Sequence, residues 1–331
     1  MINPKAFLNP KIFEPDIETV PTRNGFGEGL VLAAENDENV VGLCADLTES
    51  TRMLAFAEKF PHRFIEVGVA EQNLVTVASG MAAAGKIPFT ASYATFSPGR
   101  NWEQIRTTIC YNNLPVKIIG SHTGLSVGPD GATHQALEDL ALMRVLPNMI
   151  VISPADSIEA RKATLAIAKL NKPCYLRLSR DKAPVVTTNE TPFEIGKAEV
   201  LYEGKDVTII ATGQMVYRAL LAAEELKSHK ISVRVINCHT IKPIDKKTIL
   251  QAASETGAIV TAEEHQVTGG LGGAVAEVLS QNYPVPLKII GVEDSFGESG
   301  EPNQLLEKFG LTKEAIIKAV TQVLRMKGER V

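Results

Sequence analysis

Two acidic residues stand close together in the segment FIEVGVAEQN, residues 64–73, where Glu66 lies in an apolar run and Glu71 opens a helical pattern. An acid in the first turn of a helix is favoured by the helix dipole and by unpaired backbone N–H groups, so a helix cap is one interpretation of Glu71. The other is a carboxylate that hydrogen-bonds a ring nitrogen of a cofactor in an apolar pocket, where a low dielectric strengthens the bond. The neighbouring motifs have to decide between the two.

A second group of reactive side chains lies in SHTGLSVGPDGATHQALEDLALMRVLPNM, residues 121–149, where a predicted strand ends at His122 and a glycine-rich loop carries Asp130 and His134 toward a helix. Loops at the carboxyl ends of parallel strands are where open α/β sheets bind ligands. The spacing matches no common zinc pattern, so we predict no metal ligand, and His134 alone could be a helix cap. Histidines supply proton transfer near neutral pH and donors to developing oxyanions, which an enzyme of polyhydroxylated substrates needs.

The elements that must position these residues follow from the hydrophobic pattern. Short apolar runs rich in Val and Ile alternate with amphipathic or Ala-rich segments of helical length, which is typical of parallel sheets with crossover helices. In the first part we expect a helix at 71–85 and strands at 40–46, 64–68, 87–92, 116–122 and 149–155. In the second part we expect strands at 206–213, 232–238, 258–264 and 287–294, and helices at 215–229, at 247–257, after a tight GGLGG turn at 269–273 and after Thr312. The predicted fold is α/β, with two doubly wound domains, each a mostly parallel sheet with helices on both faces.

The length and one lapse in the pattern indicate two domains. A chain of 331 residues exceeds the size at which a single core usually stops growing. The periodicity fails in the Pro-, Thr- and charge-rich stretch RLSRDKAPVVTTNETPFEIGKAEV and resumes at Asp206. We therefore predict one domain with an N-terminal extension over 1–190 and a second over 191–331.

Composition narrows the class of protein. The chain has 34 Lys and Arg against 38 Asp and Glu, a net charge of −4, and no long run of one sign, so nothing favours nucleic acid or an anionic membrane as a partner. Four cysteines lie far apart and no secretory signal precedes them, which indicates free thiols in a reducing compartment. The apolar stretches are shorter than the ~18–20 residues of a membrane span. We expect a cytoplasmic protein.

Several motifs together resemble one enzyme family. In this order and spacing, GVAEQN, TFSPGRNWEQIR, GPDGATHQALEDLALMRVLPNM and YLRLSR are similar to the pyrimidine-binding domain of transketolases, the thiamine diphosphate enzymes that move two-carbon ketol units. After residue 195, TIIATGQMVYRALLAAEEL and AEEHQVTGGLGGAVAEVL resemble the C-terminal domain of the same family. The resemblance covers nearly the whole chain. It implies a transferase of the pentose phosphate pathway that acts between phosphorylated ketose and aldose sugars.

The resemblance also implies roles for particular residues. Glu71 matches the acid that bonds the aminopyrimidine ring and shifts it toward the imino form, and Phe96 matches the aromatic that stacks on that ring. Asp46 in CADLTES matches an acid near the thiazolium.

The substrate positions follow in the same way. His122 and His134 match the sugar-phosphate and donor-side histidines, and Asp130 matches the residue that recognises a substrate hydroxyl. Arg23, Ser50 and Arg180 match positions that, with His122, bind the acceptor phosphate. An arginine suits phosphate because its fork can bind two oxygens at once.

One part of the family pattern is absent. Transketolases begin with a diphosphate-binding domain marked by G-D-G and a later Asn, which hold Mg²⁺, and this sequence has no G-D-G. We therefore expect a half-enzyme, completed by a partner subunit that carries that motif and the metal, in an α2β2 assembly. The Ala-rich helix 71–85 is one candidate surface for the partner, although small residues also let a helix pack on its own sheet.

Three alternatives stay open at this stage. The beta subunit of a 2-oxoacid dehydrogenase first component has the same build, but a phosphate clamp has no use there. A 1-deoxyxylulose-5-phosphate synthase shares the glycine-rich loop but is normally a single long chain. A non-catalytic assembly subunit would be expected to have lost the acid, the histidines and the phosphate set, all of which are present.

Overall fold

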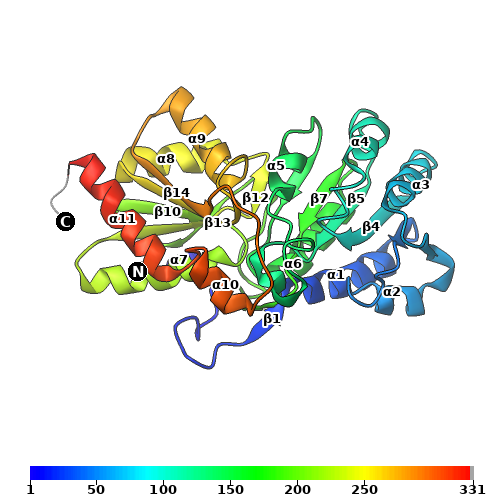
Figure 1. Ribbon diagram of the computed structural model, residues 1–331, viewed down its shortest axis with the longest axis horizontal. Coiled ribbons are helices and arrows are strands. Elements are labelled where there is room, and N and C mark those ends of the chain that lie inside the picture. Colours follow the sequence, from blue (N-terminus) through cyan, green and yellow to red (C-terminus); the bar gives the residue numbers. More distant parts are fainter. Residues whose placement is uncertain (329–331) are drawn as a thin grey trace.

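The computed structural model describes residues 1–328, which form two α/β domains side by side (Figure 1). Each domain is built on one mainly parallel sheet with helices on both faces, as the sequence predicts. None of the helices in the described chain combines the length and the hydropathy needed to cross a membrane.

The first sheet has seven strands in the order β12-β6-β7-β5-β4-β2-β3. All neighbouring pairs are parallel except β12 with β6. The strands are β2 (Val40–Cys44), β3 (Phe64–Glu66), β4 (Ile87–Tyr93), β5 (Lys117–Ser121), β6 (Ile150–Ile152), β7 (Cys174–Arg177) and β12 (Thr240–Lys242). A separate two-stranded pair joins β1 (Thr19–Pro21) to β8 (Lys182–Pro184).

Alternating residues of these strands face opposite layers of helices. On β2, Val41 and Leu43 pack on one side while Val40 and Cys44 pack on the other, as the two-residue period of a strand requires. The first layer holds α3 (Glu71–Ala83), α4 (Trp102–Gln104), the π-helical turn η3 (Ile105–Cys110) and α5 (Asp139–Arg144). The other layer holds α1 (Thr22–Asn36), α2 (Leu54–Lys59) and α6 (Ser157–Ala168). Short 3-10 turns lie at η1 (Pro4–Ala6), η2 (Pro61–Arg63) and η4 (Leu125–Asp130).

The second sheet has five strands in the order β14-β13-β10-β11-β9, with only β9 antiparallel. Its strands are β9 (Glu199–Tyr202), β10 (Val207–Ala211), β11 (Val233–Asn237), β13 (Ile259–Gln266) and β14 (Leu287–Val292). On one face lie α8 (Lys246–Thr256) and α9 (Leu271–Asn282); on the other lie α7 (Met215–Ser228), α10 (Pro302–Lys308) and α11 (Lys313–Lys327). The expected elements of this half are all present, and most of their ends are shifted by at most two residues. The exception is α9, which begins at Leu271, inside the GGLGG segment that we expected to form a turn before it.

Two segments cross between the domains. Strand β12 comes from the chain that builds the second sheet, yet it completes the edge of the first one beside β6. In the opposite direction, residues 1–12 lie against the second sheet, where the Asn3 N–H donates to the Leu201 carbonyl at 3.0 Å and Ile12 joins the second core. In Figure 1 the N-terminus accordingly lies beside α7. The sequence pattern places these first residues in an extension of the first domain, but they pack on the second.

Candidate active site

The residues singled out from the sequence follow the carboxyl ends of the parallel strands in the first sheet. Asp46 follows β2, Glu71 follows β3, Phe96 follows β4, His122 follows β5 and Arg180 follows β7. Because these five strands run parallel, their carboxyl ends share one edge of the sheet, which is the edge where α/β proteins bind ligands.

Arg23, at the start of α1, joins two of the other predicted residues. Its Nη1 donates to the Ser50 carbonyl at 2.7 Å and lies 3.2 Å from His122 Nε2. An arginine can only donate, so Nε2 is the acceptor, and the ring proton is on Nδ1, which lies 2.9 Å from Ser121 Oγ. Burial lowers the pKa of His122 to about 3, and the nearby Arg23 and Arg180 charges add to that effect. His122 is therefore a neutral, oriented imidazole at pH 7.

Arg180, which follows β7, contacts the glycine-rich loop that carries Asp130. Arg180 Nη1 donates to the Val127 carbonyl at 2.6 Å and lies 3.8 Å from Asp130 Oδ1. Burial lowers the pKa of Arg23, and the positive charges of Arg52 and Arg180 contribute to the lowering. The three guanidinium groups thus act on one another, which is the arrangement expected where an anion binds.

Arg52 is a member of this charge group that the sequence analysis did not select. Its backbone is in the left-handed region, with φ of 68°, and its Nε donates to Asn24 Oδ1 at 2.9 Å. Arg52 lies two positions after Ser50, so a search for every arginine near the matched positions would have found it.

Aromatic rings connect the two histidines. Tyr93, the last residue of β4, stacks on His122 with ring centroids 3.8 Å apart and on Phe96 at 6.0 Å. His134 meets the edges of both rings, at 6.0 Å from Tyr93 and 5.4 Å from Phe96. The structure therefore brings Phe96, His122 and His134 together through Tyr93, which the sequence analysis missed because a tyrosine that ends a strand is most often a packing residue.

Glu71 opens α3 and is 5% exposed. Its carboxylate forms no hydrogen bond or ion pair with any residue of the described chain, its own helix included. The Glu71 carbonyl accepts from Asn101 Nδ2 at 2.8 Å, and Asn101 also reaches Ser97 Oγ at 3.1 Å. The first turn of α3 is thereby fixed to the loop after Phe96, and the acid is left free to accept a hydrogen bond from a ligand.

The second acid of the opening motif has a structural role. Glu66 accepts from the backbone N–H groups of Asp46 and Gly68 at 2.7 and 2.9 Å, and from Thr48 Oγ1 at 3.0 Å. These bonds shape the turn after β2, where Asp46 is exposed with φ of 60°. The Asp46 carboxylate itself contacts none of the other predicted residues by a hydrogen bond or ion pair within residues 1–328.

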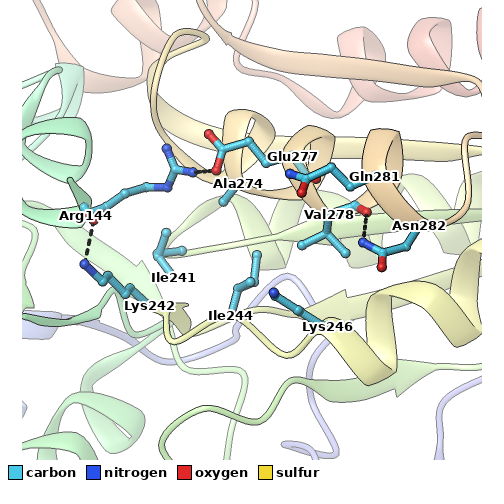
Figure 2. Close-up of a pocket in the computed structure, with 10 residues that line it drawn as sticks. All are labelled: Arg144, Ile241, Lys242, Ile244, Lys246, Ala274, Glu277, Val278, Gln281 and Asn282. Carbon is cyan, nitrogen blue, oxygen red and sulfur yellow. Dashed lines mark hydrogen bonds and ion pairs between the residues drawn. The ribbon is translucent and has the colours of Figure 1, made fainter. Parts of the chain in front are cut away.

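A different cavity lies across the junction of the two domains and contains none of the predicted site residues (Figure 2). Arg144 at the end of α5 pairs with Glu277 on α9, and its carbonyl accepts from Lys242 Nζ of β12 at 2.9 Å. These contacts tie the domains together on the face opposite α10. Within the described residues no group of three or more His, Cys, Asp and Glu side chains could hold a metal ion.

Comparison with known proteins extends over both domains. The family described as "Transketolase, pyrimidine binding domain" matches residues 18–185, and "Transketolase, C-terminal domain" matches residues 196–316. A 6-deoxy-6-sulfo-D-fructose transketolase subunit of Clostridium sp. (strain MSTE9) is 44% identical over 96% of this chain and 99% of its own length. A putative transketolase C-terminal section of Methanocaldococcus jannaschii is 44% identical over 92% of this chain and 96% of its own.

A solved structure is also similar to both domains of this chain. One described as "Split gene transketolase, inactive beta4 tetramer" superimposes with a TM-score of 0.88 at 48% sequence identity, over 93% of this chain and 99% of that chain. Sequence and fold therefore agree along nearly the entire length.

Proposed function

This chain belongs to the transketolase family of thiamine diphosphate enzymes, and from that premise we propose that it is the subunit of a split transketolase that carries the pyrimidine-binding and C-terminal domains. In this proposal it transfers a two-carbon ketol unit between phosphorylated ketose and aldose sugars. It supplies the acid that contacts the cofactor pyrimidine and the residues that bind the sugar phosphate.

The observation that carries the proposal is the oriented cationic group. Arg23 holds a neutral His122 through Nε2, and the charges of Arg52 and Arg180 act on both. Such a group favours a substrate with a terminal dianion, because guanidinium donors bind phosphate oxygens through charge-assisted hydrogen bonds. A 2-oxoacid offers no such group, so this arrangement speaks against a 2-oxoacid dehydrogenase subunit.

The residues at the carboxyl edge of the first sheet fit the pyrimidine half of the cofactor. Glu71 offers a nearly buried carboxylate without a protein partner, and Phe96 offers a ring in the adjoining loop. Thiamine diphosphate, when bound, supplies the carbon nucleophile and the electron sink for the carbon–carbon bond change. Glu71 would share a proton with a ring nitrogen of the pyrimidine, and Phe96 would exclude water from one face of the ring.

The remaining side chains would act on the sugar. In the proposed roles, Asp130 accepts a hydrogen bond from a substrate hydroxyl while Arg180 holds its position at 3.8 Å. His134, whose Nδ1 lies 2.9 Å from Thr133 Oγ1, presents its other nitrogen for proton transfer. For Asp46 the proposed place near the thiazolium is supported by its position after β2 alone.

The diphosphate and Mg²⁺ belong, in this proposal, to a partner chain with the G-D-G motif, and two chains of each kind assemble. Two relatives of matching length carry the names "subunit" and "C-terminal section", and the similar solved structure is described as coming from a split gene. Those names support a two-chain enzyme for this sequence too.

A test needs the mixture of both chains. Ketol transfer from xylulose 5-phosphate to ribose 5-phosphate is measured with thiamine diphosphate and Mg²⁺, with this chain alone, with the partner, and with Glu71→Ala plus the partner. We expect activity only in the mixture and a loss of about 10²–10⁴-fold for Glu71→Ala. The exposed acid Glu103 on α4 provides the control variant Glu103→Gln, which should keep full activity.

A sulfonated sugar is a second candidate substrate, because a sulfonate offers the arginine donors three oxygens as a phosphate does, although with one negative charge instead of two, and one relative is named for a sulfo sugar. The same assay with 6-deoxy-6-sulfofructose as donor separates the two. Pyruvate decarboxylation without ketol transfer would overturn the proposal.

A further inference from the structure

In the second sheet, the place where open α/β sheets usually bind ligands is covered by the first domain. In the order β14-β13-β10-β11, β10 comes first in the chain, β11 lies on one side of it and β13 on the other. The strand order therefore reverses between β10 and β13, and open α/β sheets bind ligands beside the carboxyl ends of strands at such a point. Here the place is taken by the glycine-rich loop 124–130 of the first domain.

Two side chains at that place hold the loop. Glu264 on β13, 4% exposed, accepts the backbone N–H of Ser126 at 2.7 Å through Oε1. Gln214, just after β10, reaches Ser126 Oγ at 3.4 Å. The loop comes so close that a Cβ added to Gly124, whose φ is +80°, would lie 2.3 Å from Glu264 Oε1. The position of Glu264 therefore requires a glycine at residue 124.

Glu264 is buried next to cationic groups. Arg177 Nη2 donates to the backbone carbonyl of Glu264 at 2.9 Å, and the positive charges of Arg177 and of Arg218 on α7 act on the Glu264 carboxyl group. Burial raises the pKa of Glu264, while Arg177, the Ser126 N–H and Arg218 act against that rise. A backbone N–H bound by a buried carboxylate is a strong and directional contact.

A second group of contacts fixes the far end of the loop. Gln135 Nε2 donates to the Glu298 carbonyl at 2.9 Å and lies 3.3 Å from the carbonyls of Leu125 and Gly128. A Cβ on Gly131 would lie 2.5 Å from Ser299 Oγ, so the segment before α10 packs directly on the loop. Figure 1 shows α10 at this junction of the two domains.

We propose that Glu264 is a positioning residue for substrate binding: the second domain uses the place where such sheets usually bind ligands to hold loop 124–130, and so fixes Asp130 and the two histidines that flank the loop. The inference rests on the proposed function, since it takes those residues as substrate contacts. It gives the C-terminal domain a task in catalysis without any contact to substrate.

The matched variants lie side by side on one strand. Glu264→Ala removes the acceptor for Ser126, and Glu264→Gln keeps one acceptor oxygen without the charge. Glu263, equally buried, accepts from the N–H groups of Leu271 and Gly272 at 2.7 Å and so caps α9 without touching the loop. Glu263→Gln is therefore the control for a general loss of stability in this domain.

Kinetics of the two-chain holoenzyme give the first readout. For Glu264→Ala we expect KM for ribose 5-phosphate to rise about tenfold, which corresponds to about 1.4 kcal/mol of binding free energy, with kcat changed less than about threefold. Glu264→Gln should give an intermediate KM and Glu263→Gln an unchanged one. Equal KM values in all variants, or the same rise in Glu263→Gln, would overturn the proposal.

Hydrogen exchange of the full chain is the second readout and needs no activity. Backbone amides of residues 123–134 should exchange faster in Glu264→Ala than in the wild type, and unchanged in Glu263→Gln. If Glu264→Ala does not fold, Glu264→Gln decides by the same measurement. If the wild-type mixture shows no ketol transfer, the proposed function fails, whereas unaltered loop exchange in the Glu264 variants would reject the positioning role.

Discussion

Arg23 offers a sharp test of the anion site, because it touches two of the other predicted residues. Replacing it in Arg23→Gln removes one positive charge and the donor to His122 Nε2 while keeping a polar side chain. A hydrogen bond to a charged group contributes about 1.5–3 kcal/mol, which corresponds to about 10- to 150-fold in affinity. We therefore expect kcat/KM for ribose 5-phosphate to fall by that factor.

The informative comparison is with ribose, the same acceptor without its phosphate. Its kcat/KM should change less than about threefold in Arg23→Gln, because in the proposed function Arg23 binds the phosphate, which ribose lacks. Assays use the two-chain holoenzyme with the acceptor concentration varied. Arg63 also donates to backbone carbonyls, those of Ala34 and Asp37 at 3.1 Å, and Arg63→Gln is the matched control.

Equal losses on ribose and ribose 5-phosphate would refute the reasoning. They would mean that Arg23 holds His122 and Ser50 in place for every acceptor, and that the phosphate binds elsewhere. A comparable loss in Arg63→Gln would point instead to a general destabilisation of α1 and its surroundings.

Two further predictions concern stability. Burial raises the pKa of Glu159, which accepts from Asn237 across the domain junction, from 4.5 to about 8. The raised pKa means that the folded state binds the proton more tightly than the unfolded state. The resulting stabilisation is fully present below pH 4.5 and is lost as the pH rises toward 8, by at most about 1.4 kcal/mol per pH unit. Urea unfolding at pH 5 and pH 8 should show this slope in the wild type and a flatter one in Glu159→Gln; identical slopes would exclude Glu159 as its source. Asp139 accepts from Arg177 at 2.8 Å in a buried pair, so Asp139→Ala should lower the free energy of unfolding by about 3–5 kcal/mol. In the same urea assay the exposed Glu277→Ala should cost less than about 1 kcal/mol, and equal costs would contradict the burial argument.

The hydrophobic periodicity predicted those strands and helices whose own residues carry the apolar pattern. Strands β2, β4, β10 and β11 begin and end within two residues of their expected bounds, because each is a short run buried along most of its length, and β2, β10 and β11 are rich in Val or Ile. Helices α7 and α11 were equally clear, since each has an apolar stripe toward the sheet and charges outward.

Helix α1 could not be predicted from its local sequence, because a tertiary contact stabilises it. Its sequence TRNGFGEGLVLAAEN carries three glycines, which disfavour a helix locally. A Cβ on Gly25 would lie 1.8 Å from the Ser157 carbonyl, and one on Gly29 would lie 2.8 Å from Thr164 Cβ. Gly25 and Gly29 let α1 approach α6 closely, and that contact offsets the poor helix propensity of the glycines.

The location of the site was predictable from the sequence, but the contacts between its residues were not. The rule on carboxyl ends of parallel strands places His122 and Phe96 at one edge without coordinates. It gives no sign that Tyr93 would link them, nor that Glu264 from a distant strand would support the loop between the histidines. The catalytic roles of Glu71, His122 and His134 stay predictions.

Strand β12 has a consequence for how the chain is made. It forms the outer edge of the first sheet, so β6 keeps a row of unpaired N–H and C=O groups until Thr240–Lys242 has left the ribosome. An open strand edge is a template for pairing with other chains, and large proteins are most exposed to such errors while still incomplete. The first sheet is therefore complete only after the part of the second domain up to β12 has been synthesised. Folding of the first domain thus depends on the second during synthesis as well as in the final structure.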